Sequence, residues 1–291
     1  MTTKSPFFSI LIPTTGRSDL IRMSIQSVLD QTFTDFEIVV SDLSRSEASK
    51  QAATDSGDPR IRYIHPREGT GSYATFDSAY KASHGTYVMW LDDDNYLFPY
   101  LLEVFHDRIM KTKADIVTAS HFYYYDKEHP RHFLRNCLGI LPFTNKETFV
   151  DPRRLLQAYY DFIDRGPSHL PRTHLSATMF TRHIVEEVEK HLGYVILDDV
   201  PNLHSVQPSL LAFAKTCYSI DYPVAIVGRL GVSQSQSWST EARKRFKKGT
   251  VQHELSPLSG YTKANGILEN YLSLKKLLPA ATPRYRSDTT I

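Results

Sequence analysis

Short apolar runs alternate with helically periodic segments through the first half of the chain. The apolar runs, each predicted to be a buried strand, are residues 7–12, 36–40, 61–64, 87–91 and 115–125. The segments that begin near residues 18, 73 and 99 carry apolar side chains at steps of three and four, which is typical of helices that bury one face. Because strands that alternate with helices form βαβ units, the pattern predicts an α/β fold with a mostly parallel central sheet flanked by helices.

The second half of the chain is less regular. Residues 126–170 are rich in His, Arg, Pro and Phe, which favours a long surface excursion. Further on, the pattern predicts two strands and two helices: strands over 176–180 and 224–227, a helix over 182–191 and a helix that begins near Asp199. Beyond Ser239 the chain becomes basic and then amphipathic over 267–278, which predicts a helical C-terminal extension.

Composition excludes several classes of protein. The chain has 291 residues, of which 41% are hydrophobic and 23% charged, as in an ordinary soluble domain. Its net charge of +2 is too small for a dedicated nucleic-acid binder. Cys137 and Cys217 form no CxxC motif, so a reducing cytoplasm is expected. Residues 1–6 lack the apolar segment of a signal peptide, and no apolar run reaches the roughly 18 residues of a membrane span.

Three carboxylates and an amide, Asp92 to Asn95, follow the predicted strand 87–91. A solvated acidic turn explains most isolated Asp-x-Asp motifs. Here, however, Thr14 and Asp42 follow two other predicted strands, and the carboxyl ends of parallel strands meet at the edge where such sheets bind ligands. Crowded carboxylates repel one another unless a cation is present, and Mg2+ and Mn2+ prefer oxygen ligands. The sequence therefore predicts a divalent-metal site for a diphosphate-bearing ligand.

Several segments together resemble glycosyltransferase family 2. They are Ser9–Thr14, Ser27–Phe33, Phe36–Val40, Gly85–Tyr87 and Leu91–Asp94. The likeness covers about 7–110 strongly and 170–235 weakly. It implies the Rossmann-like GT-A fold and an inverting enzyme that uses a nucleotide-diphosphate sugar.

The resemblance also implies a domain organisation. The GT-A catalytic domain is expected over 1–239, with a donor half of about 1–125 and an acceptor half of about 126–239. Residues 240–291 form the basic and helical C-terminal extension. No GxGxxG motif follows the first strand and no GxxxxGK[ST] motif occurs, so neither a Rossmann dinucleotide site nor a phosphate loop is supported.

In this family the residues after the first strand contact the nucleotide. The corresponding residues here are Pro13, Thr14, Thr15 and Arg17. A guanidinium can pair with a diphosphate, although a solvated Arg beside a helix is the alternative for Arg17. Asp42 corresponds to the carboxylate that accepts the uracil N–H, so a UDP-sugar is expected, but the second acid and the Gly-Ser that usually follow it are missing.

The acidic run matches the family's Asp-x-Asp metal motif in two registers, Asp92/Asp94 and Asp93/Asp94. Asp94 belongs to both registers and is the expected ligand of Mn2+ or Mg2+, with Asp92 next and His204 as a further candidate. Asp92 and Asp93 also count as nucleotide contacts, as does Asp77, which stands where the family often has Asn. The metal would stabilise the charge that develops on the departing diphosphate.

An inverting transfer also needs a base that takes the proton of the acceptor hydroxyl. In the family this acid stands at a helix start well after the metal motif, and Asp198 and Asp199 occupy that place. Two acids at a helix start also fit simple capping. The resemblance favours catalysis, with Asp199 as the expected base and Asp198 as the second choice. His174 lies where some members place a polar residue near the acceptor, although a surface or structural His is the alternative.

The basic run 243–248 is either a solvated helix face or a surface attracted to anionic lipid. A lipid contact would suit an enzyme of polysaccharide biosynthesis that lies peripherally at the inner face of the membrane and uses a glycan or lipid-linked acceptor.

A sugar nucleotidyltransferase is an alternative function, but such an enzyme uses a Gly-rich loop that this chain lacks. A non-catalytic GT-A binding module would have lost the metal or base acids. A glycoside hydrolase also uses two carboxylates but does not need the metal cluster.

Overall fold

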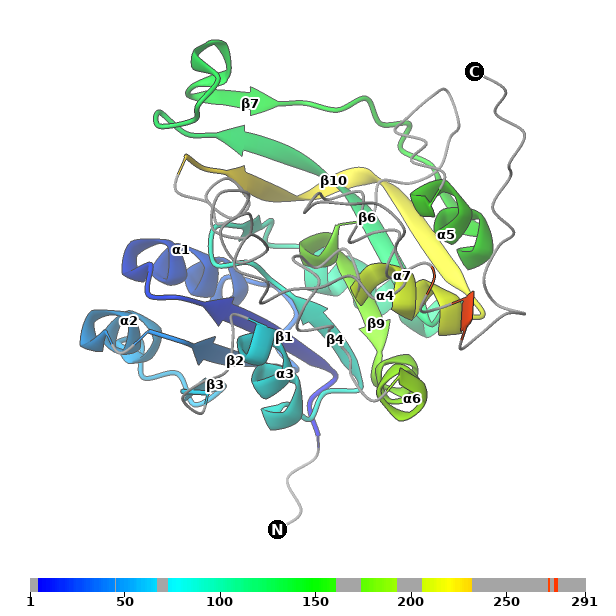
Figure 1. Cartoon of the computed structure of the whole chain (residues 1–291), viewed down its shortest axis with the longest axis horizontal. Helices are drawn as coiled ribbons and strands as arrows, with labels where there is room; N and C mark the ends of the chain where they lie inside the picture. The colour runs from blue at the N-terminus through cyan, green and yellow to red at the C-terminus, as the bar shows by residue number, and fades with distance from the viewer. Residues whose placement is uncertain are drawn as a thin grey trace.

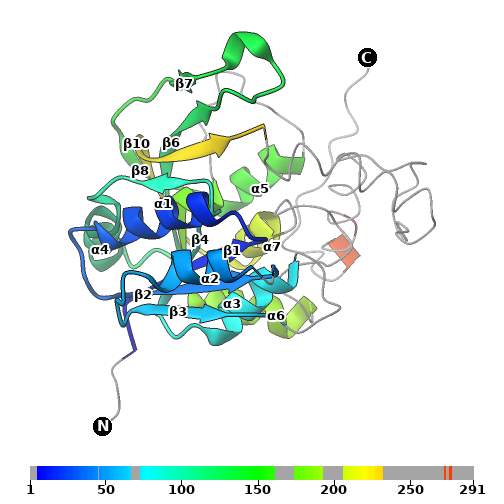
Figure 2. The same ribbon diagram turned by 90° about the vertical axis from the view of Figure 1, so that its left-hand side faces the viewer.

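The computed structural model describes residues 5–44, 46–66, 73–160, 174–192 and 206–231, together with Leu272, Lys275 and Lys276. Within these ranges a large β-sheet lies between two layers of helices, as Figure 1 and the side view in Figure 2 show. The predicted α/β architecture is therefore confirmed. Among the described helices, none is long and apolar enough to cross a membrane.

The described strands form one ten-stranded sheet in the order β3-β2-β1-β4-β9-β6-β10-β5, with β7 beside β6 and β8 beside β10. The strands are β1 (Phe8–Thr14), β2 (Phe36–Asp42), β3 (Ile61–Ile64), β4 (Tyr87–Trp90), β5 (Tyr96–Leu97), β6 (Ile116–Tyr125), β7 (Cys137–Gly139), β8 (Glu147–Val150), β9 (Thr178–Thr181) and β10 (Cys217–Arg229). The helices are α1 (Ser18–Leu29), α2 (Glu47–Thr54), α3 (Tyr73–Ala82), α4 (Leu101–Thr112), α5 (Pro152–Tyr160), α6 (Arg182–Leu192) and α7 (Val206–Phe213).

The first four strands form the parallel half of the sheet. β1 pairs in parallel with β2 and β4, and β2 pairs in parallel with β3. The connecting helices α1, α2 and α3 make these strands successive βαβ units. The register places Thr14 opposite Asp42, so the last residues of two adjacent strands lie side by side.

The other half of the sheet is mixed, because β9 runs antiparallel to both β4 and β6. β6 and β10 are parallel to each other, whereas β5, β7 and β8 pair in antiparallel fashion. Since β9 reverses the direction on each side, β4, β6 and β10 all run the same way. Their carboxyl ends therefore lie at the same edge of the sheet as the ends of β1 and β2.

Two hydrophobic clusters cover the two faces of the sheet. Phe8, Ile10 and Ile12 of β1 belong to the cluster that contains apolar residues of α1 and α4. Leu11 belongs to the other cluster, with residues of α3, α5, α6 and α7. This alternation is the period of two expected of a strand that is buried on both faces. Full burial of one such side chain contributes about 1.5 to 3 kcal/mol.

One strand is much longer than the sequence predicts. The predicted strand 224–227 is the later part of β10, which begins at Cys217. Asp221 and Pro223 interrupt the apolar pattern, which explains the missed start. The strand tolerates Asp221 because its carboxylate accepts hydrogen bonds from the backbone N and the hydroxyl of Thr144, at 2.8 and 2.6 Å.

Other segments show smaller differences. The predicted strand 176–180 begins with a 3-10 turn, Leu175–Ala177, before β9. The predicted excursion 126–170 contains β7, β8 and α5 as far as it is described, and β7 and β8 are largely exposed. Helix α2 and strand β5 were not predicted, because α2 has only Ala as apolar residues and β5 is two residues long.

The predicted C-terminal extension is described only at three residues, Leu272, Lys275 and Lys276, which are helical. Leu272 packs against the cluster that contains residues of α5 and α7. The basic run 243–248 lies outside the described residues. The domain boundaries of the sequence analysis stay predictions.

Candidate functional site

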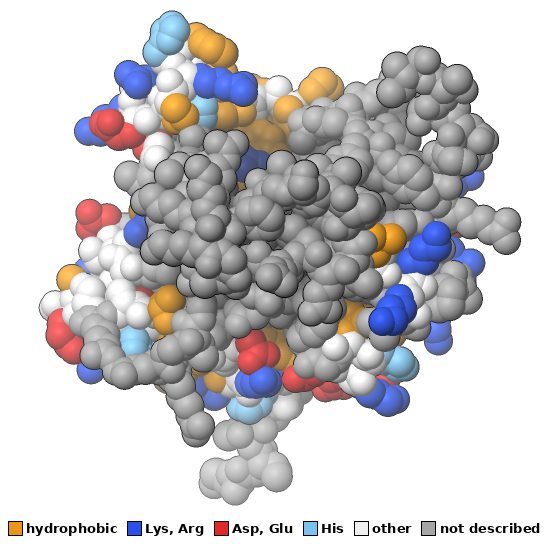
Figure 3. All heavy atoms as spheres, in the orientation of Figure 1, with side chains coloured by type: hydrophobic (Ala, Val, Ile, Leu, Met, Phe, Trp, Pro, Cys, Tyr) orange, Lys and Arg blue, Asp and Glu red, His pale blue; other side chains and the backbone are white. Residues whose placement is uncertain are grey.

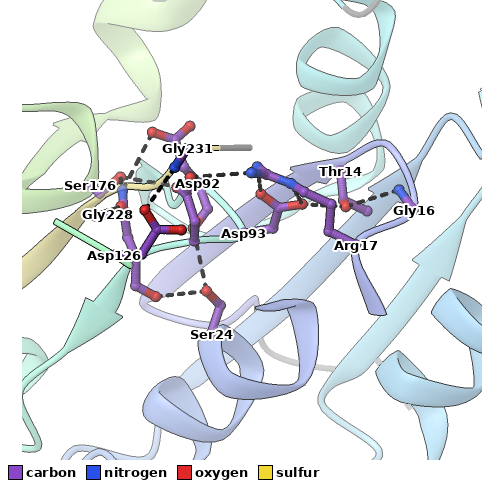
Figure 4. Close-up of polar contacts among 12 residues, drawn as sticks. Thr14, Gly16, Arg17, Ser24, Asp92, Asp93, Asp126, Ser176, Gly228 and Gly231 are labelled. Atoms are coloured by element: carbon purple, nitrogen blue, oxygen red, sulfur yellow. Dashed lines mark hydrogen bonds and ion pairs between the residues drawn. The ribbon is translucent and has the colours of Figure 1, made fainter. Parts of the chain in front are cut away.

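Polar side chains after β1 contact the acidic turn that follows β4 (Figure 4). The Thr14 hydroxyl donates to Asp93 Oδ2 at 2.5 Å. The Arg17 guanidinium pairs with both oxygens of Asp93, with Nε 3.2 Å from Oδ2, and its Nη1 lies 3.2 Å from Asp94 Oδ2. These four residues, taken from two strand ends, therefore form one cluster at the carboxyl edge of the sheet.

The turn between β1 and α1 directs Arg17 toward this cluster. Gly16 has a φ of 104°, a left-handed conformation that favours glycine. A Cβ at this position would also lie only 2.7 Å from Ser44 Cβ. Of the other predicted nucleotide contacts here, Pro13 is buried at the end of β1 and Thr15 is half-buried.

Burial strongly affects ionisation in the cluster. It raises the pKa of Asp92 to about 7, and the charges of Asp94 and Asp93 add to the rise. Burial also raises the pKa of Asp93, against the opposing effects of Arg17 and Thr14. For Arg17, burial lowers the pKa, but the three carboxylates outweigh it and raise the pKa. The ionised turn carries more negative charge than Arg17 compensates, so an added cation would be stabilised there.

The donor atoms of the turn fit a hard divalent cation, because Mg2+ and Mn2+ prefer carboxylate oxygens. Asp92 is partly exposed, whereas Asp93 is engaged by Thr14 and Arg17. In the described part of the chain, no three His, Cys, Asp or Glu side chains gather as a ready ligand set. One or two carboxylates would therefore hold the cation, and substrate oxygens would complete its coordination. Asp94, which also pairs with Arg17, stays the predicted first ligand.

Residues far apart in the sequence hold the acidic turn in place. Asn95 is fully buried, and its Nδ2 donates to Ser176 Oγ at 2.6 Å. Its Oδ1 accepts from the backbone N of Gly228 at 2.8 Å. Ser24 Oγ, from α1, donates to the Asn95 carbonyl at 2.6 Å. From the sequence, only the amide of Asn95 could be associated with the turn, since no local signal connects Ser24, Ser176 or Gly228 to it.

Gly228 also approaches the turn too closely for any side chain. A Cβ at this position would lie 2.4 Å from the Asp94 carbonyl oxygen and 3.2 Å from Asp94 Cβ. We expect Gly228→Ala to displace the turn, to destabilise the protein by about 1 to 3 kcal/mol, and to weaken metal-dependent nucleotide binding. Urea unfolding and calorimetry measure the two effects.

Gly57→Ala is the matched control for this prediction. Gly57 has a φ of 63° and no atom within 4 Å of an added Cβ, so Ala there costs stability through the backbone alone. Nucleotide binding should be unchanged in that variant. Wild-type nucleotide affinity in Gly228→Ala would show that the close contact with Asp94 does not position the site.

Asp42, at the end of β2, is fully buried. Its Oδ1 accepts from the backbone N of Ser44 at 2.7 Å, and its Oδ2 accepts from the Ser44 hydroxyl and from Tyr63 Oη, both at 2.9 Å. Burial and the Asp42 carboxylate raise the pKa of Tyr63, so Tyr63 stays a donor. A carboxylate has about four lone-pair sites, so these three bonds orient Asp42 and leave capacity for one more donor.

The remaining predicted site residues have partners other than the cluster or lie outside the described chain. Asp77, on α3, forms an ion pair with Lys81 at 2.7 Å. His174 accepts a hydrogen bond from the backbone N of Ser176 at 3.2 Å, so it caps the turn before β9. The predicted base residues Asp198 and Asp199 and the predicted ligand His204 fall outside the described residues.

A pocket of about 400 Å³ lies at the ends of β6 and β10. Its lining residues are Tyr123, Tyr125, His129, Pro130, Arg131, Leu134 and Arg229. The Arg229 guanidinium stacks on the Tyr123 ring at 4.7 Å. The charge of Arg229 also opposes the rise in the Asp92 pKa, and its neighbour Gly228 contacts Asn95. The pocket therefore offers aromatic rings and a cation beside the predicted donor site.

Comparisons with known proteins point to one family. The family model described as glycosyl transferase family 2 matches residues 9–188. A putative colanic acid biosynthesis glycosyl transferase, WcaA of Escherichia coli, is 36% identical over 121 residues, which are 41% of this chain and 42% of the relative. A GalNAc(5)-diNAcBac-PP-undecaprenol beta-1,3-glucosyltransferase of Campylobacter jejuni is 32% identical over 95 residues, 32% of this chain and 31% of the relative. The chain thus matches less than half the length of these curated relatives.

Solved structures show the same fold at low sequence identity. Staphylococcus aureus TarS 1-349 in complex with UDP-GlcNAc matches with a TM-score of 0.60 and 15% identity, over 92% of this chain and 72% of that chain. The mannosyltransferase PcManGT of Pyrobaculum calidifontis, in complex with GDP-Man and Mn2+, matches with a TM-score of 0.52 and 15% identity, over 96% of this chain and 74% of that chain.

Proposed function

The chain belongs to glycosyl transferase family 2, and we propose that it is a metal-dependent inverting glycosyltransferase. It would transfer a sugar from a nucleotide-diphosphate sugar, a UDP-sugar first, to a hydroxyl of a glycan or lipid-linked acceptor. The predicted family and GT-A fold are confirmed by the family match and the structural neighbours. The observation that carries the proposal is the cluster in which Thr14 and Arg17 contact Asp93 and Asp94 at the sheet edge.

The donor diphosphate would bind at this cluster. Asp94, with Asp92 or Asp93, would hold Mn2+ or Mg2+, which supplies Lewis-acid stabilisation of the departing diphosphate. Arg17 pairs with both Asp93 and Asp94, and on donor binding its guanidinium would exchange one of these carboxylates for a phosphate oxygen. The Mn2+ and nucleotide-sugar complexes of the structural neighbours support this proposal.

The nucleoside would extend from the cluster toward Asp42, because Thr14 and Asp42 are paired at adjacent strand ends. The three hydrogen bonds from Ser44 and Tyr63 hold the Asp42 carboxylate in one orientation. A preorganised carboxylate suits the N–H of uracil, which is the reason to propose UDP. Contacts from Pro13, Thr15 and Asp77 to the nucleotide are part of the same proposal.

The acceptor would approach from the side of Arg229, which lines the pocket and whose charge acts on Asp92. Aromatic rings and a guanidinium suit a sugar that carries a phosphate, as in a lipid-linked glycan. The Campylobacter relative, named as a transferase for a PP-undecaprenol-linked glycan, supports this class of substrate. Asp199 would take the proton of the attacking hydroxyl, with Asp198 as the alternative. His204 as a metal ligand and 243–248 as a lipid contact stay proposals.

Calorimetry with UDP, GDP and CDP, in Mn2+ and in chelator, tests the donor proposal. UDP should bind most tightly and only weakly without metal. Asp42→Ala should lose about 1.5 to 3 kcal/mol of UDP binding, the cost of a hydrogen bond to a charged group, and should keep the metal dependence. Asp107→Ala, which removes an exposed carboxylate on α4, is the control and should bind UDP normally.

The reaction products separate the proposal from its alternatives. A glycosyltransferase releases UDP from a UDP-sugar when an acceptor is present. Release of pyrophosphate from UTP and a sugar phosphate would instead identify a sugar nucleotidyltransferase. Tight UDP-sugar binding without turnover over a panel of acceptors would identify a binding module. Equal binding of all three nucleotides would show that Asp42 does not select uracil.

A further inference from the structure

Residues 129–146 form a segment that is both apolar and basic at the surface. Its exposed large apolar side chains are Phe133 (67%), Leu138 (46%), Ile140 (65%) and Phe143 (39%). It also carries Arg131, Arg135 and Lys146, all exposed, and contains no Asp or Glu. Scattered exposed apolar residues are ordinary, but four within one short basic segment mark an interaction surface. We call residues 129–146 the basic apolar segment.

The segment projects from the body of the molecule. β7 and the ends of β6 and β10 extend beyond the helical layers at the top of Figure 1 and Figure 2. In the space-filling view, hydrophobic, basic and His side chains gather at the upper left, with acidic side chains at their margin (Figure 3). Glu128 and Glu147 flank the segment, and Glu147 is held by Arg108 at 2.7 Å.

The two faces of the β6–β7 hairpin have different surroundings. Tyr124 pairs directly with Leu138, and both side chains are exposed, at 40% and 46%. Tyr123 and Tyr125 point to the opposite face, because successive strand residues alternate, and they line the pocket beside the acidic turn. One face of the hairpin thus carries exposed apolar side chains, while the other lines the pocket.

We propose that the basic apolar segment docks onto an anionic lipid bilayer. Phe133 and Ile140 would enter the headgroup region, and Arg131 and Arg135 would contact lipid phosphates. Apolar side chains combined with Lys or Arg are the composition of surfaces that lie in a membrane interface. A second copy of the chain is a poorer occupant, because two such segments would bring only positive charges together. This docking does not depend on the proposed sugar transfer. It would place the face of the hairpin that carries Tyr123 and Tyr125 near molecules held in the membrane.

Cosedimentation of the full chain with vesicles tests the proposal. One set of vesicles contains phosphatidylglycerol and phosphatidylcholine, and the other contains phosphatidylcholine alone. The protein should sediment with the anionic vesicles and much less with the neutral ones. Binding to both sets alike, or to neither, would contradict the proposal.

Two double variants separate the contribution of the basic side chains to vesicle binding from that of the apolar side chains. Arg131→Gln with Arg135→Gln should lower partitioning to anionic vesicles by about 30-fold, from two lost surface charges. Phe133→Ser with Ile140→Ser should lower it by about tenfold or more, from the lost apolar burial. These side chains are exposed, and Gln at position 135 can still donate to the His129 carbonyl that Arg135 Nε contacts at 2.8 Å, so the folded state should be retained in both variants.

Met110→Ser is the matched control, because Met110 is 48% exposed on α4, outside the segment. It should bind vesicles like the wild type. If both double variants bind normally, the lipid contact lies elsewhere, for example at 243–248, and the proposal is wrong. Light scattering gives the last check: a wild-type dimer that Phe133→Ser with Ile140→Ser makes monomeric would assign the face to a second copy and overturn the lipid assignment.

Discussion

Asp199→Asn is expected to lower sugar transfer by about 10² to 10⁴-fold, the usual contribution of a positioned general base. Asn keeps the shape and most hydrogen bonding of Asp but cannot accept a proton from the acceptor hydroxyl. Binding of the donor and the metal should stay near wild type, because the proposed donor contacts come from the ends of β1, β2 and β4. Transfer rates would be measured beside nucleotide affinities for the same preparation.

Asp198→Asn is the neighbouring control, and it should cost far less, since Asn caps a helix as well as Asp does. The contrast between the two variants separates catalysis from helix capping. If Asp198→Asn is the inactive variant, the base is one residue earlier than proposed. If both variants stay active, the proton goes to another group and the proposed inverting mechanism is wrong.

Asp94→Ala is expected to remove most of the gain in nucleotide affinity that Mn2+ or Mg2+ gives the wild type. Asp94 is common to both registers of the metal motif, and its removal leaves Asp92 and Asp93, of which Asp93 is engaged by Thr14 and Arg17. In chelator the variant should bind the nucleotide no worse than the wild type, because Arg17 loses one competing carboxylate. Calorimetry measures the nucleotide affinity of both proteins, once with the metal and once with a chelator.

Two outcomes would contradict this assignment. An undiminished metal effect in Asp94→Ala would move coordination to Asp92 or to residues elsewhere. A metal effect already missing in the wild type would remove the metal from the mechanism. Asp107→Ala, with its exposed carboxylate on α4, controls for the change in net charge and should behave like the wild type in both conditions.

The parallel half of the fold and the edge that carries the site could be predicted from sequence, because both depend on local patterns. Continuous apolar runs predicted β1 to β4, and their alternation with helical segments predicted the order of these units. Thr14 and Asp42 are the last residues of β1 and β2, and the acidic turn follows β4. The parallel topology alone therefore places them at one edge of the sheet. β10 was predicted only in part, because Asp221 and Pro223 break its apolar pattern.

Only the tertiary structure decided how the acidic turn is held and neutralised. Arg17 was expected to face a diphosphate, and the structure pairs it with Asp93 and Asp94. Asn95 is bound by Ser176 and Gly228, which are distant in the sequence and arrive on the 3-10 turn before β9 and on β10. Local periodicity contains no information about such partners, because which side chains meet depends on the path of the chain through the sheet.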